Sequence, residues 1–235
     1  MLVPDAMTNL AAVPDELSDE QVLMCPDIMS TGLAGAKRAN IRIGDTVAVF
    51  AQGPIGLCAT AGAKLSGATT VIGVDRLTNR LEIARQMGAD HVIDSSRTDP
   101  VEAIMRLTDG RGVDVAIKAL GTQATFEACL RVRRPGGTLS SLGVYSTDLT
   151  IPLGAFAAGL GDHQIVTSLC PRGQGAHAPP DVGDPVGARR LRTDGHAPLQ
   201  AGRHREGLRA VQPSARRRAE GGDHALRLLR TACRH

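Results

Sequence analysis

Aromatic residues are scarce in this 235-residue sequence, which contains three Phe, one Tyr and no Trp. Proteins that hold single-stranded nucleic acids stack the bases on aromatic side chains, so this composition argues against that class. The sequence also lacks any apolar run near the roughly 18 residues that a membrane-spanning helix needs. We therefore expect neither a membrane partner nor a specific nucleic-acid partner.

Cysteine is rare and dispersed, and no CxxC pair occurs among its five residues. The N-terminus shows no charged segment followed by an apolar segment of the kind found in secretory signals. Without a disulfide pattern or a signal, the sequence predicts a reduced, cytoplasmic protein.

Lysine is scarce as well, and all three lysines precede residue 172, where the composition changes. Residues 1–171 carry a net charge of −4, whereas residues 172–235 carry +7 and contain no Ile, Met, Phe or Tyr. A segment so poor in apolar residues cannot bury enough surface to offset the entropy of ordering. We expect residues 172–235 to be a disordered tail whose Arg clusters contact no specific nucleic acid.

The first part of the chain alternates between short apolar runs and amphipathic segments. Short, mostly unbroken apolar runs are typical of buried parallel strands, and such strands need crossover helices. The sequence therefore predicts an α/β fold, a doubly wound parallel sheet of six strands with helices on both faces. Strands are expected at 46–50, 71–74, 91–93, 113–117, 138–142 and 165–168, and helices at 55–65, 79–87, 100–108 and 122–132.

A glycine-containing turn follows the first predicted strand. The residues Ala51-Gln52-Gly53-Pro54-Ile55-Gly56 match A-x-G-x-x-G, with Ala51 at the first glycine position. In dinucleotide sites the glycines let the backbone approach a pyrophosphate, which lies on the free N–H groups of the next helix. A plain strand-to-helix turn would give the same pattern, so the turn alone does not decide.

An acidic residue strengthens the nucleotide interpretation. Asp75 ends the second predicted strand about 20 residues after the turn, where a carboxylate accepts the ribose hydroxyls of NAD. Its charge would repel a 2′-phosphate and favours NAD over NADP, although Arg76 and Arg80 lie nearby and could weaken this preference. A solvated strand end and an S-adenosylmethionine methyltransferase site remain alternatives.

Several segments of residues 1–171 together resemble one family. They read VLMCPDIMSTGLAGAKRANIRIGDTVAVFAQGPIG, AGAKLSGATTVIGVD, MGADHVID, TDGRGVDVAIKALG, RRPGGTLSSLGVY and IVTSLCP. The family is the zinc-dependent medium-chain alcohol dehydrogenases, in their bacterial secondary-alcohol and formaldehyde-dehydrogenase-like branch. The resemblance implies hydride transfer between a small alcohol or aldehyde and NAD(P), a catalytic zinc, and a homo-oligomer.

The resemblance also implies roles for individual residues. Asp27 matches the third protein ligand of the catalytic zinc, and Thr31 matches a residue near the nicotinamide. The expected cofactor-binding residues are Gly53, Pro54, Ile55, Gly56, Asp75, Arg76, Arg80, Ala119, Leu120, Gly121, Leu142, Gly143 and Val144.

Two departures from the family shape the expected domain organisation. The domain that supplies the Cys and His zinc ligands has no counterpart, so residues 1–40 are interpreted as its remnant with a connecting helix, and residues 41–171 as the NAD(P)-binding domain. Because a catalytic zinc needs three protein ligands, Asp27 cannot hold it alone, and we expect this chain by itself to be inactive. Lys118 also stands where an acidic residue is expected.

The tail is the second departure. After residue 171 the likeness stops within a few residues, but one allowed coding of residues 174–226, read one base later, spells a sequence like the C-terminal helix and strand of the family. We therefore interpret residues 172–235 as frame-shifted. A methyltransferase and a non-enzymatic nucleotide-binding module remain alternative functions.

Overall fold

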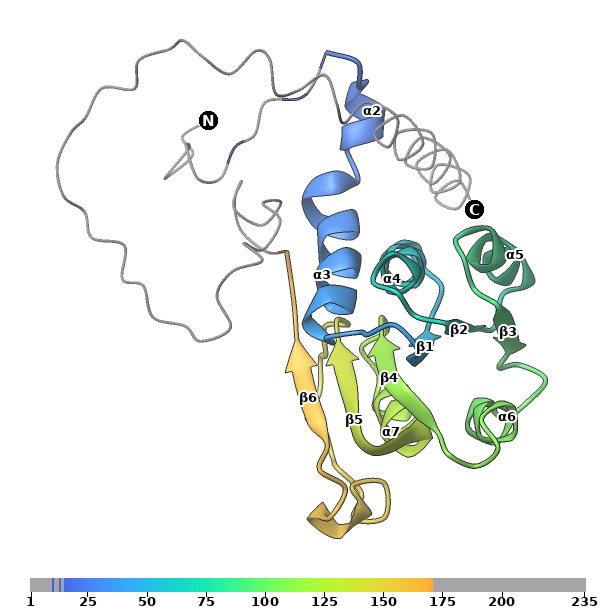
Figure 1. The fold of residues 1–235 in the computed structure, drawn as a ribbon. Helices are drawn as coiled ribbons and strands as arrows, with labels where there is room; N and C mark the ends of the chain where they lie inside the picture. Colours follow the sequence, from blue (N-terminus) through green and yellow to red (C-terminus); the bar gives the residue numbers. More distant parts are fainter. Residues whose placement is uncertain (1–9, 11–12, 14, 171–235) are drawn as a thin grey trace, which may run out of the picture. The chain divides into compact units, whose positions relative to one another are not determined.

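A computed structural model of the chain describes residues 10, 13 and 15–170. The expectations for residues 172–235, disorder and a shifted reading frame, lie outside these residues. Figure 1 shows the described elements. In chain order they are α2 Asp19–Val22, the π-helix η1 Cys25–Met29, α3 Ser30–Arg38, β1 Thr46–Phe50, α4 Pro54–Leu65, β2 Thr70–Asp75, α5 Thr78–Gln86, β3 His91–Asp94, α6 Pro100–Leu107, β4 Val113–Lys118, α7 Gln123–Val132, β5 Arg133–Ser141, the 3-10 helix η2 Ala157–Gly159 and β6 Gln164–Thr167.

The six strands form one sheet in the order β3-β2-β1-β4-β5-β6, and every neighbouring pair is parallel. The prediction of a doubly wound parallel sheet is confirmed. The order reverses between β1 and β4, and open sheets of this kind bind ligands outside the carboxyl ends of their strands at such a point. The carboxyl edge beside β1 and β4 is therefore the place to look for a site.

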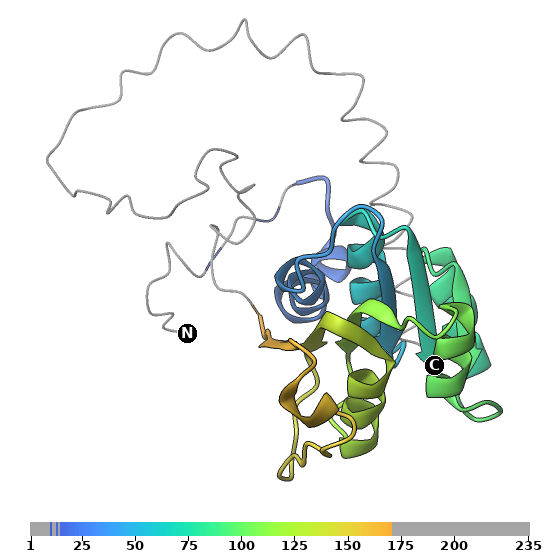
Figure 2. The same ribbon diagram turned by 60° about the horizontal axis from the view of Figure 1, so that its bottom comes forward.

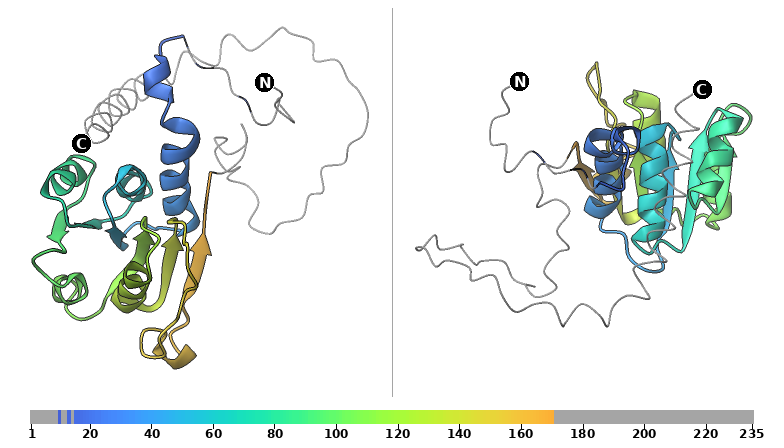
Figure 3. Two further views of the ribbon diagram at one scale, coloured as in Figure 1. Left: turned by 180° about the vertical axis from the view of Figure 1, so that it is seen from behind. Right: turned by 90° about the horizontal axis from the view of Figure 1, so that it is seen from above.

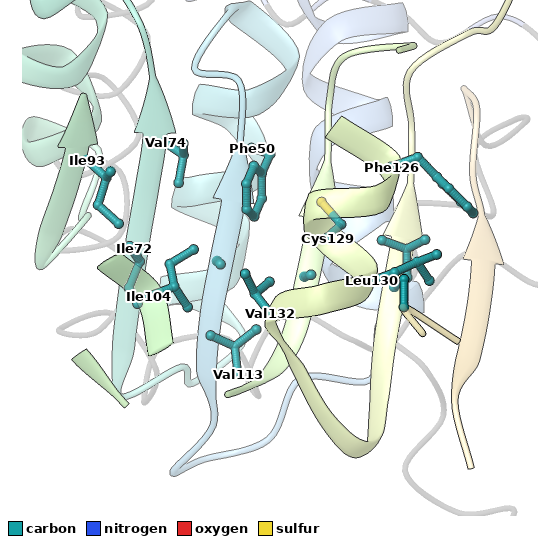
Figure 4. Close-up of a cluster of buried hydrophobic side chains, with 14 residues drawn as sticks. Phe50, Ile72, Val74, Ile93, Ile104, Val113, Phe126, Cys129, Leu130 and Val132 are labelled. Carbon is teal, nitrogen blue, oxygen red and sulfur yellow. The ribbon is translucent and has the colours of Figure 1, made fainter. Parts of the chain in front are cut away.

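Helices cover both faces of the sheet. One face carries α3, α4 and α5, which lie side by side in the right-hand view of Figure 3, and the other carries α6 and α7. Strand side chains alternate between the two faces. Val47 and Val49 contribute to the core under α3 and α4, while Ala48 and Phe50 contribute to the core under α6 and α7, which Figure 4 shows.

Small residues bring α3 close to its neighbours. A Cβ on Gly32 would lie 2.5 Å from the Cβ of Cys58 in α4, and one on Gly35 would lie 2.6 Å from the side chain of Leu142. The Ser140 hydroxyl in β5 also donates to the Gly35 carbonyl over 2.9 Å. These contacts place α3 beside α4 and over β5, as Figure 1 and Figure 2 show, so its first turn lies near the carboxyl edge.

The fifth strand begins earlier than predicted, at Arg133 rather than at residue 138. Arg133 pairs with Val113 of β4, and the register then shifts before Val115 pairs with Thr138. Gly136 in this irregular stretch has a φ of 72° and donates its N–H to the Gly161 carbonyl over 2.7 Å. The Arg-Arg-Pro-Gly-Gly sequence masked this start because charged residues, Pro and Gly usually interrupt a strand.

Among the described residues, no helix is both long and apolar enough to cross a membrane.

Candidate functional site

The residues expected to bind the cofactor lie together at the carboxyl edge of the sheet. The turn 53–56 follows β1, Asp75 ends β2, and the segments 119–121 and 142–144 follow β4 and β5. Their common placement is a consequence of the parallel arrangement, which brings all strand carboxyl ends to one edge. The structure thus brings these residues to one edge, as the sequence predicts.

The turn after β1 opens directly into a long helix. Gly53 is the N-cap of α4 and has an extended backbone, Pro54 occupies the first turn, and no side chain caps this helix end. The first N–H groups of a helix have no acceptors within the helix. By contrast, Asp99 and Thr122 cap α6 and α7 with their own side chains. The start of α4 therefore offers N–H donors and the positive end of a helix dipole to an anion.

Gly56 is the position in this turn that tolerates no side chain. A Cβ built there would lie 1.8 Å from the carbonyl oxygen of Ala51. Ala51 itself has a φ of 69°, in the left-handed region that favours glycine. The Ala51 N–H nevertheless donates to the Val74 carbonyl over 2.8 Å, which ties the turn to β2. Ala51 thus adopts a glycine-like backbone at the position where the motif departs from its usual glycine.

A buried amide holds the turn from below. The Gln52 side chain is fully buried, donates to the Val49 carbonyl over 2.8 Å and accepts from the Thr60 hydroxyl over 2.9 Å. These two bonds link β1, the turn and α4. The sequence alone does not single out Gln52, because its importance depends on partners that only the folded turn brings together.

Asp75 is a structural acceptor as well as a candidate ligand residue. Its Oδ2 accepts from the Gln52 N–H over 2.6 Å, and its Oδ1 accepts from the N–H groups of Arg76 and Leu77 over 2.7 and 3.0 Å. Only 6% of the residue is exposed. An ionised carboxylate has about four acceptor positions. Three are occupied, so one remains for a hydroxyl at the edge of the sheet.

The two arginines near Asp75 differ in position. Arg80 Nη1 lies 3.8 Å from Asp75 Oδ2, and the same atom lies 3.8 Å from the position of a Cβ on Gly53. Arg80 therefore lies between the carboxylate and the turn. Arg76 is exposed and contacts Asp75 through its backbone N–H.

The segments after β4 and β5 touch through their backbones. A Cβ on Gly121 would lie 1.6 Å from the Val144 carbonyl oxygen, and one on Gly143 would lie 2.5 Å from the Gly121 nitrogen. Beside these glycines the side chains of Leu120 and Val144 are 48% and 79% exposed. The pair of segments thus presents exposed apolar side chains next to a closely packed backbone.

A buried lysine lies beneath these two segments. Lys118, the last residue of β4, is fully buried, and its Nζ lies 3.4 Å from the Gly143 carbonyl oxygen and 3.5 Å from the centre of the Tyr145 ring. None of the ion pairs among the described residues includes Lys118. Burial lowers the pKa of Lys118 to about 8. Lys118, which stands where the family resemblance implies an acidic residue, thus places a weakly compensated ammonium group under the site.

The two residues assigned to the catalytic centre lie together near the start of α3. The Thr31 hydroxyl is buried and donates to Asp27 Oδ1 over 3.3 Å. The sequence did not identify a third member of this group, Cys170, whose thiol donates to Asp27 Oδ1 over 2.9 Å and whose N–H donates to the Thr31 hydroxyl over 3.1 Å. The bond to Asp27 raises the pKa of the Cys170 thiol.

These residues do not make a zinc site within the described part of the chain. A catalytic zinc takes three protein ligands and keeps a fourth position open. Asp27 and Cys170 are two potential donors, and the described residues contain no group of three or more His, Cys, Asp or Glu able to hold a metal. The donor set present does not fit a catalytic zinc.

Comparison with known proteins identifies relatives of the chain. Residues 54–178 match the family model described as zinc-binding dehydrogenase. An alcohol dehydrogenase of Cupriavidus necator is 72% identical over 174 residues, which are 74% of this chain and 48% of the relative. An NADP-dependent isopropanol dehydrogenase of Thermoanaerobacter brockii is 38% identical over 175 residues, 73% of this chain and 49% of the relative.

A solved structure of an alcohol dehydrogenase is also similar to this chain. The alcohol dehydrogenase TADH from Thermus sp. ATN1 superposes with a TM-score of 0.66 at 34% identity, over 72% of this chain and 48% of that chain. The chain spans about half the length of the curated relatives that it matches.

Proposed function

Because the chain belongs to the zinc-binding dehydrogenase family, we propose that residues 41–171 are the NAD-binding domain of an alcohol dehydrogenase. Residues 1–40 are then the remnant of the catalytic domain together with the connecting helix. When bound, the nicotinamide supplies a hydride acceptor for the oxidation of a small alcohol to its carbonyl product. The observation that carries the proposal is the uncapped start of α4 directly after β1, with the Asp75 carboxylate at the end of the next strand.

The turn fits a pyrophosphate. Gly53 leaves the backbone without a side chain where the phosphates approach, Gly56 lets α4 begin close against the Ala51 carbonyl, and the first N–H groups of α4 lie beside Gly53. Arg80 Nη1 lies close to Gly53 and adds a positive charge beside it. Backbone donors, a helix dipole and a guanidinium together favour a doubly charged diphosphate.

The end of β2 fits an unphosphorylated ribose. Asp75 has one acceptor position left, which suits a ribose hydroxyl, whereas a 2′-phosphate would bring a second negative charge against a buried carboxylate. Some relatives, such as the Thermoanaerobacter enzyme, are NADP-dependent. We infer that Asp75 gives this chain a preference for NAD that Arg76 and Arg80 reduce but do not reverse.

The segments after β4 and β5 fit the nicotinamide half. A dinucleotide whose adenosine half lies over β2 extends across the switch point toward β4 and β5. There, Leu120 and Val144 offer apolar side chains to one side of a planar ring. Thr31 lies near the same edge, because α3 lies over β5.

Nucleotide binding by the full chain tests the proposal. Calorimetry should show one site for ADP-ribose and for NADH, with NADH the tighter ligand because its nicotinamide half adds contacts. S-Adenosylhomocysteine serves as the competitor that a methyltransferase would prefer, although the relatives reported above are dehydrogenases. Tighter binding of S-adenosylhomocysteine than of NADH, or no binding of ADP-ribose, would overturn the assignment.

A further inference from the structure

Gln52 lies in the turn after β1, and both polar atoms of its side chain are bonded inside the protein. Its Nε2 donates to the Val49 carbonyl over 2.8 Å, and its Oε1 accepts from the Thr60 hydroxyl of α4 over 2.9 Å. Gln52 and Thr60 are both fully buried. A buried polar group whose partner is removed loses its hydrogen bond without gaining one to water. The two bonds therefore fix the Gln52 side chain between β1 and α4.

The neighbouring strand leaves room for this amide. Gly73 lies within β2, where a glycine weakens the strand and often marks the close approach of another group. A Cβ on Gly73 would lie 3.4 Å from Cδ and Nε2 of Gln52 and 3.4 Å from the Cβ of Ala84 in α5. The amide of Gln52 thus packs against β2 at the one position of that strand without a side chain.

The turn has a strained backbone that needs this support. Ala51, next to Gln52, has a φ of 69°, and a residue other than glycine keeps such a backbone only where the surrounding structure holds it. The bond from the Ala51 N–H to the Val74 carbonyl holds one side of the turn, and the Gln52 side chain holds the other. Loss of the bond between Thr60 and Gln52 should therefore let the turn relax.

The backbone of Gln52 also orients the Asp75 carboxylate. The Gln52 N–H donates to Oδ2 over 2.6 Å, whereas the N–H groups of Arg76 and Leu77 both donate to Oδ1. Each carboxylate oxygen has about two acceptor positions, so the free position belongs to Oδ2. Arg80 Nη1 lies 3.8 Å from Oδ2, too far for a hydrogen bond. The Gln52 N–H therefore sets the direction in which the free position of Oδ2 points.

We propose that Gln52, held by Thr60, is a positioning residue for nucleotide discrimination. Its N–H directs the free position of Asp75 Oδ2 toward the 2′-hydroxyl of the adenosine ribose, the group that NADP carries as a phosphate. This inference rests on the proposed dinucleotide function and traces the preference for NAD to a buried pair. Because Thr60 is fully buried, its hydroxyl acts on the ligand through Gln52 and Asp75.

Calorimetric titration of the full chain with NAD and with NADP tests this role through the ratio of the two dissociation constants. A shift of the turn weakens the pyrophosphate contacts of both nucleotides alike and cancels in the ratio, whereas a misdirected Asp75 carboxylate weakens NAD. Thr60→Val keeps the shape of the side chain and removes its hydroxyl, so it should reduce the preference for NAD about threefold to tenfold. Thr60→Ser keeps the hydroxyl and loses a buried methyl group, so it should destabilise the fold and still retain the preference.

A second titration tests whether the effect passes through Asp75. In the Asp75→Asn background, Thr60→Val should change the ratio less than about twofold, because residues that act through one another are not additive. Thr108→Val is the matched control, since the Thr108 hydroxyl at the end of α6 likewise bonds a carbonyl and an N–H group; it should leave the ratio unchanged. An unchanged ratio in Thr60→Val, or a change that persists in the Asp75→Asn background, would overturn the role.

Failure of this role can be distinguished from failure of the proposed function. If ADP-ribose does not bind to the unaltered chain, the dinucleotide assignment is overturned and this role with it. If ADP-ribose binds and the ratio is the same in Thr60→Val, the positioning role alone is overturned. Should Thr60→Val fail to fold, Gln52→Met removes both side-chain bonds of Gln52, and an unchanged ratio in that variant overturns the role in the same way.

Discussion

At the scale of single residues, Asp75 combines two roles that a substitution must separate. Its carboxylate orders three backbone N–H groups and, in the proposed function, also accepts a ribose hydroxyl. Truncation to Gly would remove both roles at once. Asn keeps one acceptor oxygen and nearly the same shape, so it tests the charge with less damage to the turn.

We therefore predict that Asp75→Asn weakens NAD binding and narrows the preference for NAD over NADP. Loss of a charge-assisted hydrogen bond costs roughly 1.5 to 3 kcal/mol, which corresponds to about a tenfold to a hundredfold rise in Kd. Titration calorimetry with both nucleotides measures the change. Asp109→Asn, an exposed turn residue at the amino edge, is the matched control and should leave both affinities unchanged. An unaltered chain that binds NADP as tightly as NAD would refute the role of Asp75.

Lys118 leads to a prediction about pH. Its folded-state pKa of about 8 lies below the ordinary lysine value of 10.5, so the unfolded chain holds more protons between these values and stability rises with pH there. The full penalty is present below pH 8 and amounts to roughly 3 kcal/mol. Lys118→Met should therefore be more stable at pH 7 by up to about this amount, less the lost contact with the Tyr145 ring.

Urea unfolding at pH 7, 8, 9 and 10 measures this dependence. The difference in unfolding free energy between the unaltered chain and Lys118→Met should shrink as the pH rises. Because both proteins contain the same thiols, taking this difference cancels the contribution of thiol titration. Lys37→Met, at an exposed position in α3, should show a constant difference. If the difference in unfolding free energy between Lys118→Met and the unaltered chain does not change with pH, the buried amine of Lys118 is not the source of a pH-dependent loss of stability.

At the scale of elements, the turn between β1 and α4 depends on the close approach of Gly56 to Ala51. A Cβ at Gly56 meets a backbone carbonyl, so Gly56→Ala must displace the start of α4. Overpacking of this kind costs about 1 to 3 kcal/mol, and the displaced N–H groups should weaken ADP-ribose binding at least about tenfold. Gly154→Ala, where nothing lies within 4 Å, is the control. Unchanged ADP-ribose affinity in Gly56→Ala would place the phosphates elsewhere.

Most elements could be predicted from the sequence because their signals are local. Unbroken apolar runs indicate buried strands, and Gly or Pro marks the ends of the helices, so the positions of β1, α4 and β4 follow from the printed residues. The placement of Asp75 beside the turn follows once the sheet is known to be parallel.

The remaining features depend on contacts between distant residues. Cys170 bonds to Asp27, 143 positions earlier, because the residues after β6 lie against the start of α3, and no local pattern encodes that docking. Lys118 and Arg133 are buried although charged residues are usually exposed. Their burial reflects the strand positions they occupy, and a sequence pattern assigns such residues to the surface or to a loop.

At the scale of the whole molecule, the zinc-ligand count sets the expected activity. With two candidate donors among the described residues, Asp27 and Cys170, in place of three, a zinc ion would exchange with solvent and would not hold an alcohol oxygen in place. We predict that the purified 235-residue chain, given zinc, NAD and short primary or secondary alcohols, forms no NADH above a protein-free control. Measurable turnover together with one bound zinc per chain would contradict this prediction.

The position of β1 in the middle of the sheet also has a consequence for how the chain folds. The Thr46 N–H at the start of β1 donates to the Asp114 carboxylate in β4 over 2.8 Å, across 68 residues of sequence. At a synthesis rate of roughly 5 to 20 residues per second, about 3 to 14 s therefore pass between the synthesis of Thr46 and that of its partner Asp114. Until then one edge of β1 and the apolar faces that α7 later covers stay open to association with other chains. Chaperone binding to nascent chains should peak before residue 118 emerges and fall once β4 has docked.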